Sequence, residues 1–204
     1  MTEPKFVLLT GSSSKLGRPI AEILAAKKYN ILLHYFKSEK ETISLAKTLK
    51  YKFSEQDFCP IHIDLSKNNS RRSIKKLIPK SKNIIGIINN ASLYLEDSKD
   101  NFKFEDYKKN INIHYRNPLT LISLLIENGG VSFAINITDN NLNKDKYFSY
   151  SMSKSMLSDY CFENSSTSLK NINMVEFKPK KILPSKDSYK NITKFKQEFN
   201  KLLK

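Results

Sequence analysis

The chain has 204 residues, of which 39% are hydrophobic, and a formal net charge of +15. That length is enough for one buried core, so we expect a single domain over residues 1–204. No apolar run approaches the roughly 18 residues that span a bilayer, and the apolar stretch near the N-terminus is too short for a signal peptide. Cys59 and Cys161 lack the spacing of metal ligands. We therefore expect a cytoplasmic protein with reduced thiols, no metal site and no membrane partner.

The excess of lysine does not by itself indicate a nucleic-acid site. The lysines are spread along the whole chain and are not gathered in one patch. A nucleic-acid interface would concentrate them on one face or one segment. We expect no nucleic-acid partner, although the charge would favour the approach of anionic ligands.

Short apolar runs alternate with helical patterns along the chain. The runs are rich in Val, Ile and Leu, as is typical of strands buried on both faces, and lie at residues 6–10, 31–36, 60–65, 84–89, 131–138 and 172–177. The helical patterns cover residues 17–28, 39–52, 68–78, 103–127, 149–168 and 187–203. This alternation predicts an α/β fold of the Rossmann type, with a doubly wound parallel sheet of about six strands and helices on both faces.

The turn after the first expected strand reads TGSSSKLG at residues 10–17. Gly11 would allow the tight turn, and Gly17 would let the following helix pack close to the strand. The amides at that helix N-terminus would then face a pyrophosphate. The alternative is a turn of small residues that binds nothing.

The end of the second expected strand indicates the choice of cofactor. It reads HYFKS at residues 34–38, where an NAD-selective site would usually place an acidic residue on the ribose hydroxyl. Lys37 and Ser38 instead offer a charge and a hydroxyl to a 2′-phosphate, and Lys15 could reach the same group. The pattern favours NADPH, with two solvated lysines as the alternative.

The sequence YSMSK at residues 150–154 places Tyr150 and Lys154 four positions apart. On a helix they would share one face, about one turn apart. A nearby ammonium would lower the pKa of the phenol from about 10, which would make Tyr150 a usable proton donor.

Four motifs in this order, TGSSSKLG, HIDLS, NNAS and YSMSK, resemble the short-chain dehydrogenase/reductase family. The resemblance implies that Asp64 contacts adenine with Leu65 beside it, and that NNAS forms a turn under the cofactor. The cofactor-binding residues it implies are Gly11, Ser13, Lys15, Leu16, Gly17, Tyr35, Lys37, Ser38, Asp64, Leu65, Asn90, Ala91, Lys154 and Pro179.

Several details resemble one subgroup, the pteridine reductases and the bacterial dihydromonapterin/dihydrofolate reductases. These details are Lys15, HYFKS, the serine of NNAS and INITD at the fifth expected strand. The resemblance places Asp139 where most of the wider family carries a catalytic serine. It implies an NADPH-dependent reductase of a dihydropterin or dihydrofolate, and a homo-oligomer, either a dimer or a tetramer.

The resemblance also assigns roles to the residues of the reaction. Tyr150 would donate the proton, Lys154 would also hold the nicotinamide ribose, and Asp139 would orient Tyr150 or relay protons. Tyr94 would cover the pterin ring, and Ser92 could bond either the pterin or a cofactor phosphate. The alternative for Tyr94 is an ordinary half-buried aromatic residue.

Three departures from the family pattern leave alternatives open. His114 stands where the family usually has asparagine, and the Asp139–Tyr150 interval is shorter than usual, which makes Thr138 a second candidate for the site. We also expect a C-terminus shorter than the family norm. The alternatives are a general carbonyl or oxoacyl reductase and a cofactor-binding protein without catalytic activity.

Two other features indicate packing. His34 and His62 lie in strand patterns, where histidines are more often packed than catalytic. An apolar stripe with helical spacing, expected to face the core or another subunit, comprises Tyr189, Ile192, Phe195, Phe199 and Leu202.

Overall fold

The computed structural model describes residues 4–69, 71–77, 83–127, 133–140, 142–165, 172–180 and 188–203. The undescribed parts of the expected elements are residues 70 and 78 of the third helix, residues 131–132 of the fifth strand, residues 166–168 of the fifth helix and residue 187 of the last helix.

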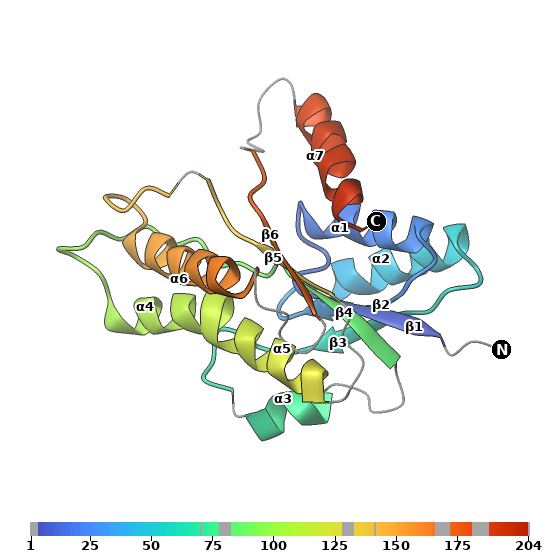
Figure 1. The fold of residues 1–204 in the computed structure, drawn as a ribbon, viewed down its shortest axis with the longest axis horizontal. Coiled ribbons are helices and arrows are strands. Elements are labelled where there is room, and N and C mark those ends of the chain that lie inside the picture. Colours follow the sequence, from blue (N-terminus) through green and yellow to red (C-terminus); the bar gives the residue numbers. More distant parts are fainter. Residues whose placement is uncertain are drawn as a thin grey trace.

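The centre of the molecule is one parallel sheet of six strands in the order β3-β2-β1-β4-β5-β6 (Figure 1). From β1 the chain runs outward to β3, then returns to the other side of β1 and continues to β6, which confirms the expected doubly wound Rossmann-type fold. The direction reverses between β1 and β4, where such sheets bind ligands at their carboxyl edge. The strands are β1 Lys5–Leu9, β2 Asn30–Tyr35, β3 Phe58–His62, β4 Asn83–Asn89, β5 Phe133–Ile137 and β6 Asn173–Phe177.

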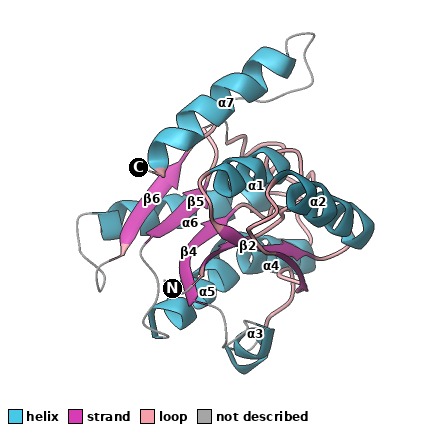
Figure 2. Cartoon of the chain, turned by 90° about the vertical axis from the view of Figure 1, so that its right-hand side faces the viewer, coloured by secondary structure: helices cyan, strands magenta, loops and turns pink. Residues whose placement is uncertain are grey.

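Helices cover both faces of the sheet (Figures 1 and 2). One face carries α1 Gly17–Ala26, α2 Glu39–Lys52 and α7 Ser188–Leu202. The other carries α3 Arg71–Leu77, α4 Phe104–Ile111, α5 Asn117–Glu127 and α6 Phe148–Ser165. None of the described helices is long and apolar enough to cross a membrane.

The strands alternate their side chains between two cores. On β1, Val7 and Leu9 pack in the cluster beneath α1 and α2, whereas Phe6 and Leu8 pack in the cluster beneath α3 and α5. Because successive side chains of a strand point to opposite faces, a strand buried on both sides must be apolar throughout. This explains the continuous apolar runs of the sequence.

The expected helix over residues 103–127 contains an irregular turn. Between α4 and α5 lies the π-helical segment η1, Asn112–Arg116. Pro118 is the second residue of α5, and a proline inside a helix has no amide for the carbonyl four residues earlier, which here belongs to His114. A widened turn accommodates that loss.

The apolar stripe of the last helix faces the core. Phe195 and Phe199 are buried, with ring centroids 5.7 and 5.6 Å from that of Phe177 on β6. Ile192 and Leu202 are partly buried on the same helix, and the side chain of Tyr189 lies outside the described residues. The stripe therefore packs α7 against β6 and α1.

Candidate active site

The turn after β1 requires glycine at two positions. Gly11 has a φ of +62°, and a Cβ there would lie 3.0 Å from the Ala91 Cα. A Cβ on Gly17 would lie only 2.2 Å from the carbonyl oxygen of Gly11. Both glycines permit a close approach of backbone segments, as expected for a loop that binds phosphate.

Polar side chains hold this turn in place. The Gly11 amide donates to His34 Nδ1 at 3.0 Å, and Asn90 Nδ2 donates to the carbonyls of Thr10 and Gly11 at 2.9 and 3.0 Å. The Gly17 amide donates to Ser14 Oγ at 3.0 Å. The amide of Gly17 is thus bonded to a serine and does not face open space, unlike the expectation for this helix N-terminus.

A cavity of about 1020 Å³ lies over the carboxyl edge of the sheet at the switch between β1 and β4. Most of the expected cofactor residues line it: Gly11, Ser13, Lys15, Leu16, Tyr35, Lys37, Ser38, Asp64, Leu65, Asn90, Ala91 and also Ser92. Gly17 lies buried behind its wall. The volume is suited to a nucleotide-sized ligand.

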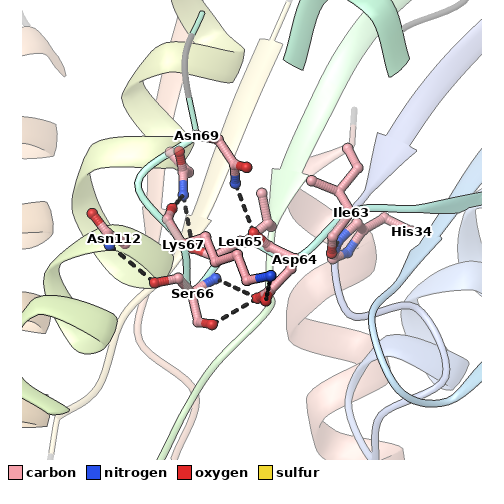
Figure 3. Close-up of polar contacts among 9 residues, drawn as sticks. His34, Ile63, Asp64, Leu65, Ser66, Lys67, Asn69 and Asn112 are labelled. Atoms are coloured by element: carbon pink, nitrogen blue, oxygen red, sulfur yellow. Dashed lines mark hydrogen bonds and ion pairs between the residues drawn. The ribbon is translucent and has the colours of Figure 1, made fainter. Parts of the chain in front are cut away.

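Asp64 is the centre of a small hydrogen-bonded cluster after β3 (Figure 3). One of its carboxylate oxygens accepts from the amide and the hydroxyl of Ser66 at 3.0 and 2.6 Å, and Lys67 lies 3.8 Å from the other. Asn112 Nδ2 donates to the carbonyl of Ser66 at 2.9 Å, and this bond connects the cluster to η1. Hydrogen bonds among its own residues therefore stabilise the turn that places Asp64 on the cavity wall.

The two histidines of the strand patterns differ in environment. His34 is buried, and its Nε2 lies 2.9 Å from the carbonyl of Ile63 (Figure 3). Since its Nδ1 accepts from Gly11, Nε2 must donate to Ile63. Burial lowers the pKa of His34 from 6.5 to about 4, so the ring is neutral. His62 is exposed, with its ring 5.9 Å from that of Phe36, so the expectation of packing is correct only in part.

The residues of YSMSK and INITD meet at the same edge of the sheet. Tyr150, in the first turn of α6, donates its hydroxyl to Asp139 Oδ2 at 2.8 Å. Lys154 is buried one turn later and donates to the carbonyl of Ile137 at 2.7 Å. Its Nζ is 5.9 Å from the centroid of the Tyr150 ring. None of the three residues lines the large cavity.

Asp139, and not Thr138, is the partner of Tyr150. The Thr138 hydroxyl donates to Glu176 Oε1 on β6 at 2.6 Å. The two neighbouring residues thus diverge, with the carboxylate toward α6 and the hydroxyl toward β6.

The pKa of Tyr150 shifts in the direction opposite to the one expected. Burial and the hydrogen bond to Asp139 raise it well above its usual value, because both disfavour the phenolate. Lys154 is not among the groups that shift the pKa of Tyr150, and its ammonium donates to the carbonyl of Ile137. Burial lowers the pKa of Lys154 itself to about 8.

The start of α6 is capped by Asp97, which lies in the segment between β4 and α4. Asp97 accepts from the amide and hydroxyl of Ser149, and its carbonyl accepts from the Phe148 amide at 3.1 Å. A carboxylate at a helix N-terminus satisfies free amides and interacts favourably with the helix dipole. This cap places Tyr150 against Asp139 despite the short interval. The sequence offered no signal for it, because Asp97 lies far from Ser149 along the chain.

Aromatic rings border Tyr150. Tyr94 is 56% exposed and packs edge-on against Tyr150, with ring centroids 4.7 Å apart. It also stacks on Tyr147 at 4.1 Å. Tyr94 thus lies beside the ring of Tyr150 and is more exposed than buried.

Pro179 and His114 do not line the large cavity. Pro179 is partly buried after β6, and the carbonyl of the preceding Lys178 accepts from Asn140 Nδ2 at 3.2 Å. His114 is buried in η1 and contacts Ser92, Leu93 and Ser153. The sequence identified His114 only as a departure from a pattern and not as a link between elements. No group of three or more His, Cys, Asp or Glu residues that could hold a metal occurs in the part of the chain that the structure describes.

Known proteins of similar structure share this fold. A structure described as FolM alternative dihydrofolate reductase 1 from Brucella canis, complexed with NADP, superposes with a TM-score of 0.79 and 23% identity over 93% of this chain and 78% of that one. A blue fluorescent protein from a metagenomic library, in complex with NADPH, gives 0.76 and 21% over 94% and 82%. At these identities the likeness shows the fold.

Sequence comparison identifies the family. An uncharacterized oxidoreductase of Bacillus subtilis (strain 168), YmfI, is 43% identical over 49 residues, which span 24% of this chain and only 20% of that protein. Residues 5–160 match the short chain dehydrogenase family. That match includes the glycine turn, the NNAS turn and YSMSK, so the chain belongs to the short chain dehydrogenase family of oxidoreductases.

Proposed function

We propose that this protein is an NADPH-dependent reductase of a dihydropterin or dihydrofolate-type substrate, with Tyr150 as the proton donor. The observation that carries the proposal is the 2.8 Å hydrogen bond from the Tyr150 hydroxyl to Asp139, with Lys154 buried one turn away. A carboxylate at this position suits a substrate that must be protonated at nitrogen, because it can accept from a ring N–H or a relay water.

The cavity at the switch point fits NADPH. Gly11 lines the cavity, Gly17 lets α1 pack close to the turn after β1, and Lys15, Lys37 and Ser38 line the wall where the adenosine ribose would lie. Cations favour a 2′-phosphate over a bare hydroxyl. The NADP and NADPH complexes of the two similar structures support this choice. When bound, the cofactor supplies the hydride.

The chain would supply the proton from Tyr150. Its raised pKa keeps the hydroxyl protonated at neutral pH, so the proton is present before the reaction. Asp139 orients that hydroxyl through their hydrogen bond. Lys154, with a pKa of about 8, is mostly charged at pH 7 and would hold the nicotinamide ribose.

The aromatic edge of the site suits a flat heterocycle. Tyr94 lies beside Tyr150 and exposes 56% of its surface. A planar, electron-poor ring can stack on such a side chain while its edge is read by polar groups. The family also contains ketone reductases, but a carboxylate paired with the donor tyrosine offers a neutral carbonyl no additional hydrogen-bond donor.

An assay of NADPH oxidation with a dihydropterin, dihydrofolate and an acetoacetyl thioester tests the proposal. Turnover of either of the first two, in preference to the thioester, is the expected result. Preference for the thioester would assign the protein to the carbonyl reductases. NADPH binding without turnover of any of the three would support the alternative of a non-catalytic cofactor-binding protein.

We also propose that the protein forms a homo-oligomer. The resemblance to the family supports this proposal, and Phe162, which is 76% exposed on α6, offers a position at which to test a contact surface. Light scattering should give a mass of a dimer or tetramer, and Phe162→Asp should lower it. A monomeric wild-type protein at assay concentrations would contradict this proposal.

A further inference from the structure

His114 connects three separate segments around the candidate active site. Its side chain is only 1% exposed. Nε2 lies 2.9 Å from the Ser92 hydroxyl and 3.1 Å from the Leu93 amide, both in the segment after β4. Nδ1 lies 2.8 Å from the hydroxyl of Ser153 on α6.

The backbone amide of Leu93 fixes the tautomer of His114. An amide can only donate, so Nε2 must carry a lone pair and no hydrogen. In a neutral imidazole the hydrogen is then on Nδ1, which donates to Ser153 Oγ. The Ser153 hydroxyl in turn donates to the carbonyl of Tyr150 at 2.9 Å. In this series of hydrogen bonds every donated hydrogen points the same way, from the segment after β4 toward α6.

The surroundings keep His114 neutral. Burial lowers its pKa well below 6.5, and the charge of Lys154 acts in the same direction. A protonated ring would place a hydrogen on Nε2 against the Leu93 amide and would lose that bond.

The direction of these hydrogen bonds determines whether the Ser92 hydroxyl donates to a ligand or accepts from it. Because Nε2 carries no hydrogen, the Ser92 hydroxyl must be the donor in its contact with His114. Its lone pairs are then available to accept a hydrogen bond from a ligand. Ser92 is exposed on the wall of the large cavity, so a ligand can reach them.

We infer that His114 is a positioning residue that makes Ser92 a hydrogen-bond acceptor, and that this part of the site therefore selects a ligand with an N–H donor. The inference rests on the proposed function. An ionised cofactor phosphate has only acceptors and would face the lone pairs of Ser92. Of the two ligands open to Ser92, the heterocycle with an amino group or ring N–H is the one that fits.

The same histidine positions the donor helix. Its ring meets that of Tyr150 edge-on, with centroids 5.3 Å apart, while Ser153 holds the Tyr150 backbone. The His114 ring thus fixes the position of the Ser92 hydroxyl relative to that of Tyr150.

Nitrogen NMR of the ¹⁵N-histidine-labelled wild-type protein tests the tautomer without requiring activity. We expect His114 to show a protonated Nδ1 and an unprotonated Nε2 at pH 7. Observation of the opposite tautomer, or of an imidazolium, would overturn the inference even if the protein reduces pterins.

Ligand affinity tests the consequence for Ser92. The probes are a pterin and unsubstituted pteridine, which has no N–H donor, each titrated into the NADP⁺-loaded protein. Ser92→Ala should weaken the pterin roughly 2- to 10-fold, as for one neutral hydrogen bond, and leave pteridine unchanged. His114→Phe should reduce the same preference, and the double variant should lose no more than either single variant.

Three results would contradict the inference. The first is that Ser92→Ala keeps the wild-type preference for pterin over pteridine, and the second is that Ser92→Ala loses affinity for NADPH instead of for pterin. The third is that the losses of the two single variants add in the double variant. If His114→Phe does not fold, Ser92→Ala and the tautomer still decide the inference. If neither probe binds although NADPH does, the proposed function fails while the NMR result stands.

Discussion

Lys37 carries the argument for the phosphorylated cofactor, because it lies on the cavity wall just after β2, where the adenosine ribose is expected. A charge-assisted hydrogen bond contributes roughly 1.5–3 kcal/mol. Lys37→Ala should therefore weaken NADPH at least about tenfold and leave NADH nearly unchanged. Fluorescence titration of both cofactors measures this, with Lys40→Ala, an exposed lysine on α2, as the matched control. Equal wild-type affinities for the two cofactors would contradict the assignment.

Tyr150 is the proposed proton donor. Tyr150→Phe removes the hydroxyl that is bonded to Asp139 but keeps the ring beside Tyr94. Turnover should fall by roughly 10²–10⁴, the range for loss of a general acid, while NADPH affinity is retained. Steady-state kinetics would show this, and Tyr160→Phe on the same helix controls for loss of a hydroxyl. Wild-type turnover in Tyr150→Phe would place the protein in the non-catalytic alternative.

At the scale of elements, His34 connects the turn after β1 to the ends of β2 and β3. Its pKa is lowered by burial from 6.5 to about 4, so the unfolded chain binds the proton more readily than the folded one between these values. The free energy of unfolding should fall as pH drops from 6.5 toward 4, by about 3 kcal/mol from this group.

Urea unfolding of the wild-type protein and of His34→Gln across that pH range measures the contribution of His34. The variant should be less stable at pH 7 and should lose less stability on acidification. Parallel curves for the two proteins would show that His34 does not carry the effect.

Most elements could be predicted from the sequence, because each strand buried on both faces is an apolar run and each helix follows at regular spacing. The irregular turn η1 was not predicted. Its cause, Pro118, was visible, but the response of the helix depends on the packing of His114 between the segment after β4 and α6. Long-range contacts of this kind are not encoded in local periodicity.

For the whole molecule, the switch in strand order between β1 and β4 determines where the motifs meet. The glycine turn, the ends of β2 and β3 and the NNAS turn converge on one cavity. Their order along the chain was enough to predict this convergence and the family. The sequence could not show that Asp97 caps α6 or that burial and Asp139 would raise the pKa of Tyr150, since both depend on how separate segments pack together.

The charge of the molecule agrees with an anionic cofactor. The chain carries a formal net charge of +15, and lysines at positions 15, 37, 67, 108 and 109 line the cavity. Such a field raises the rate of association with anions and should be weakened by salt.

We propose that Asp139, paired with Tyr150, adapts the site to a pterin. The ratio of kcat/KM for a dihydropterin to kcat/KM for a simple ketone, measured for the wild type, Asp139→Ser and Thr138→Val, tests this role of Asp139. Because Asp139 accepts from Tyr150 while Thr138 donates to Glu176, only Asp139→Ser should lower the ratio, by at least about tenfold for a charge-assisted bond. A ratio unchanged in Asp139→Ser, with turnover lost only in Thr138→Val, would contradict the account.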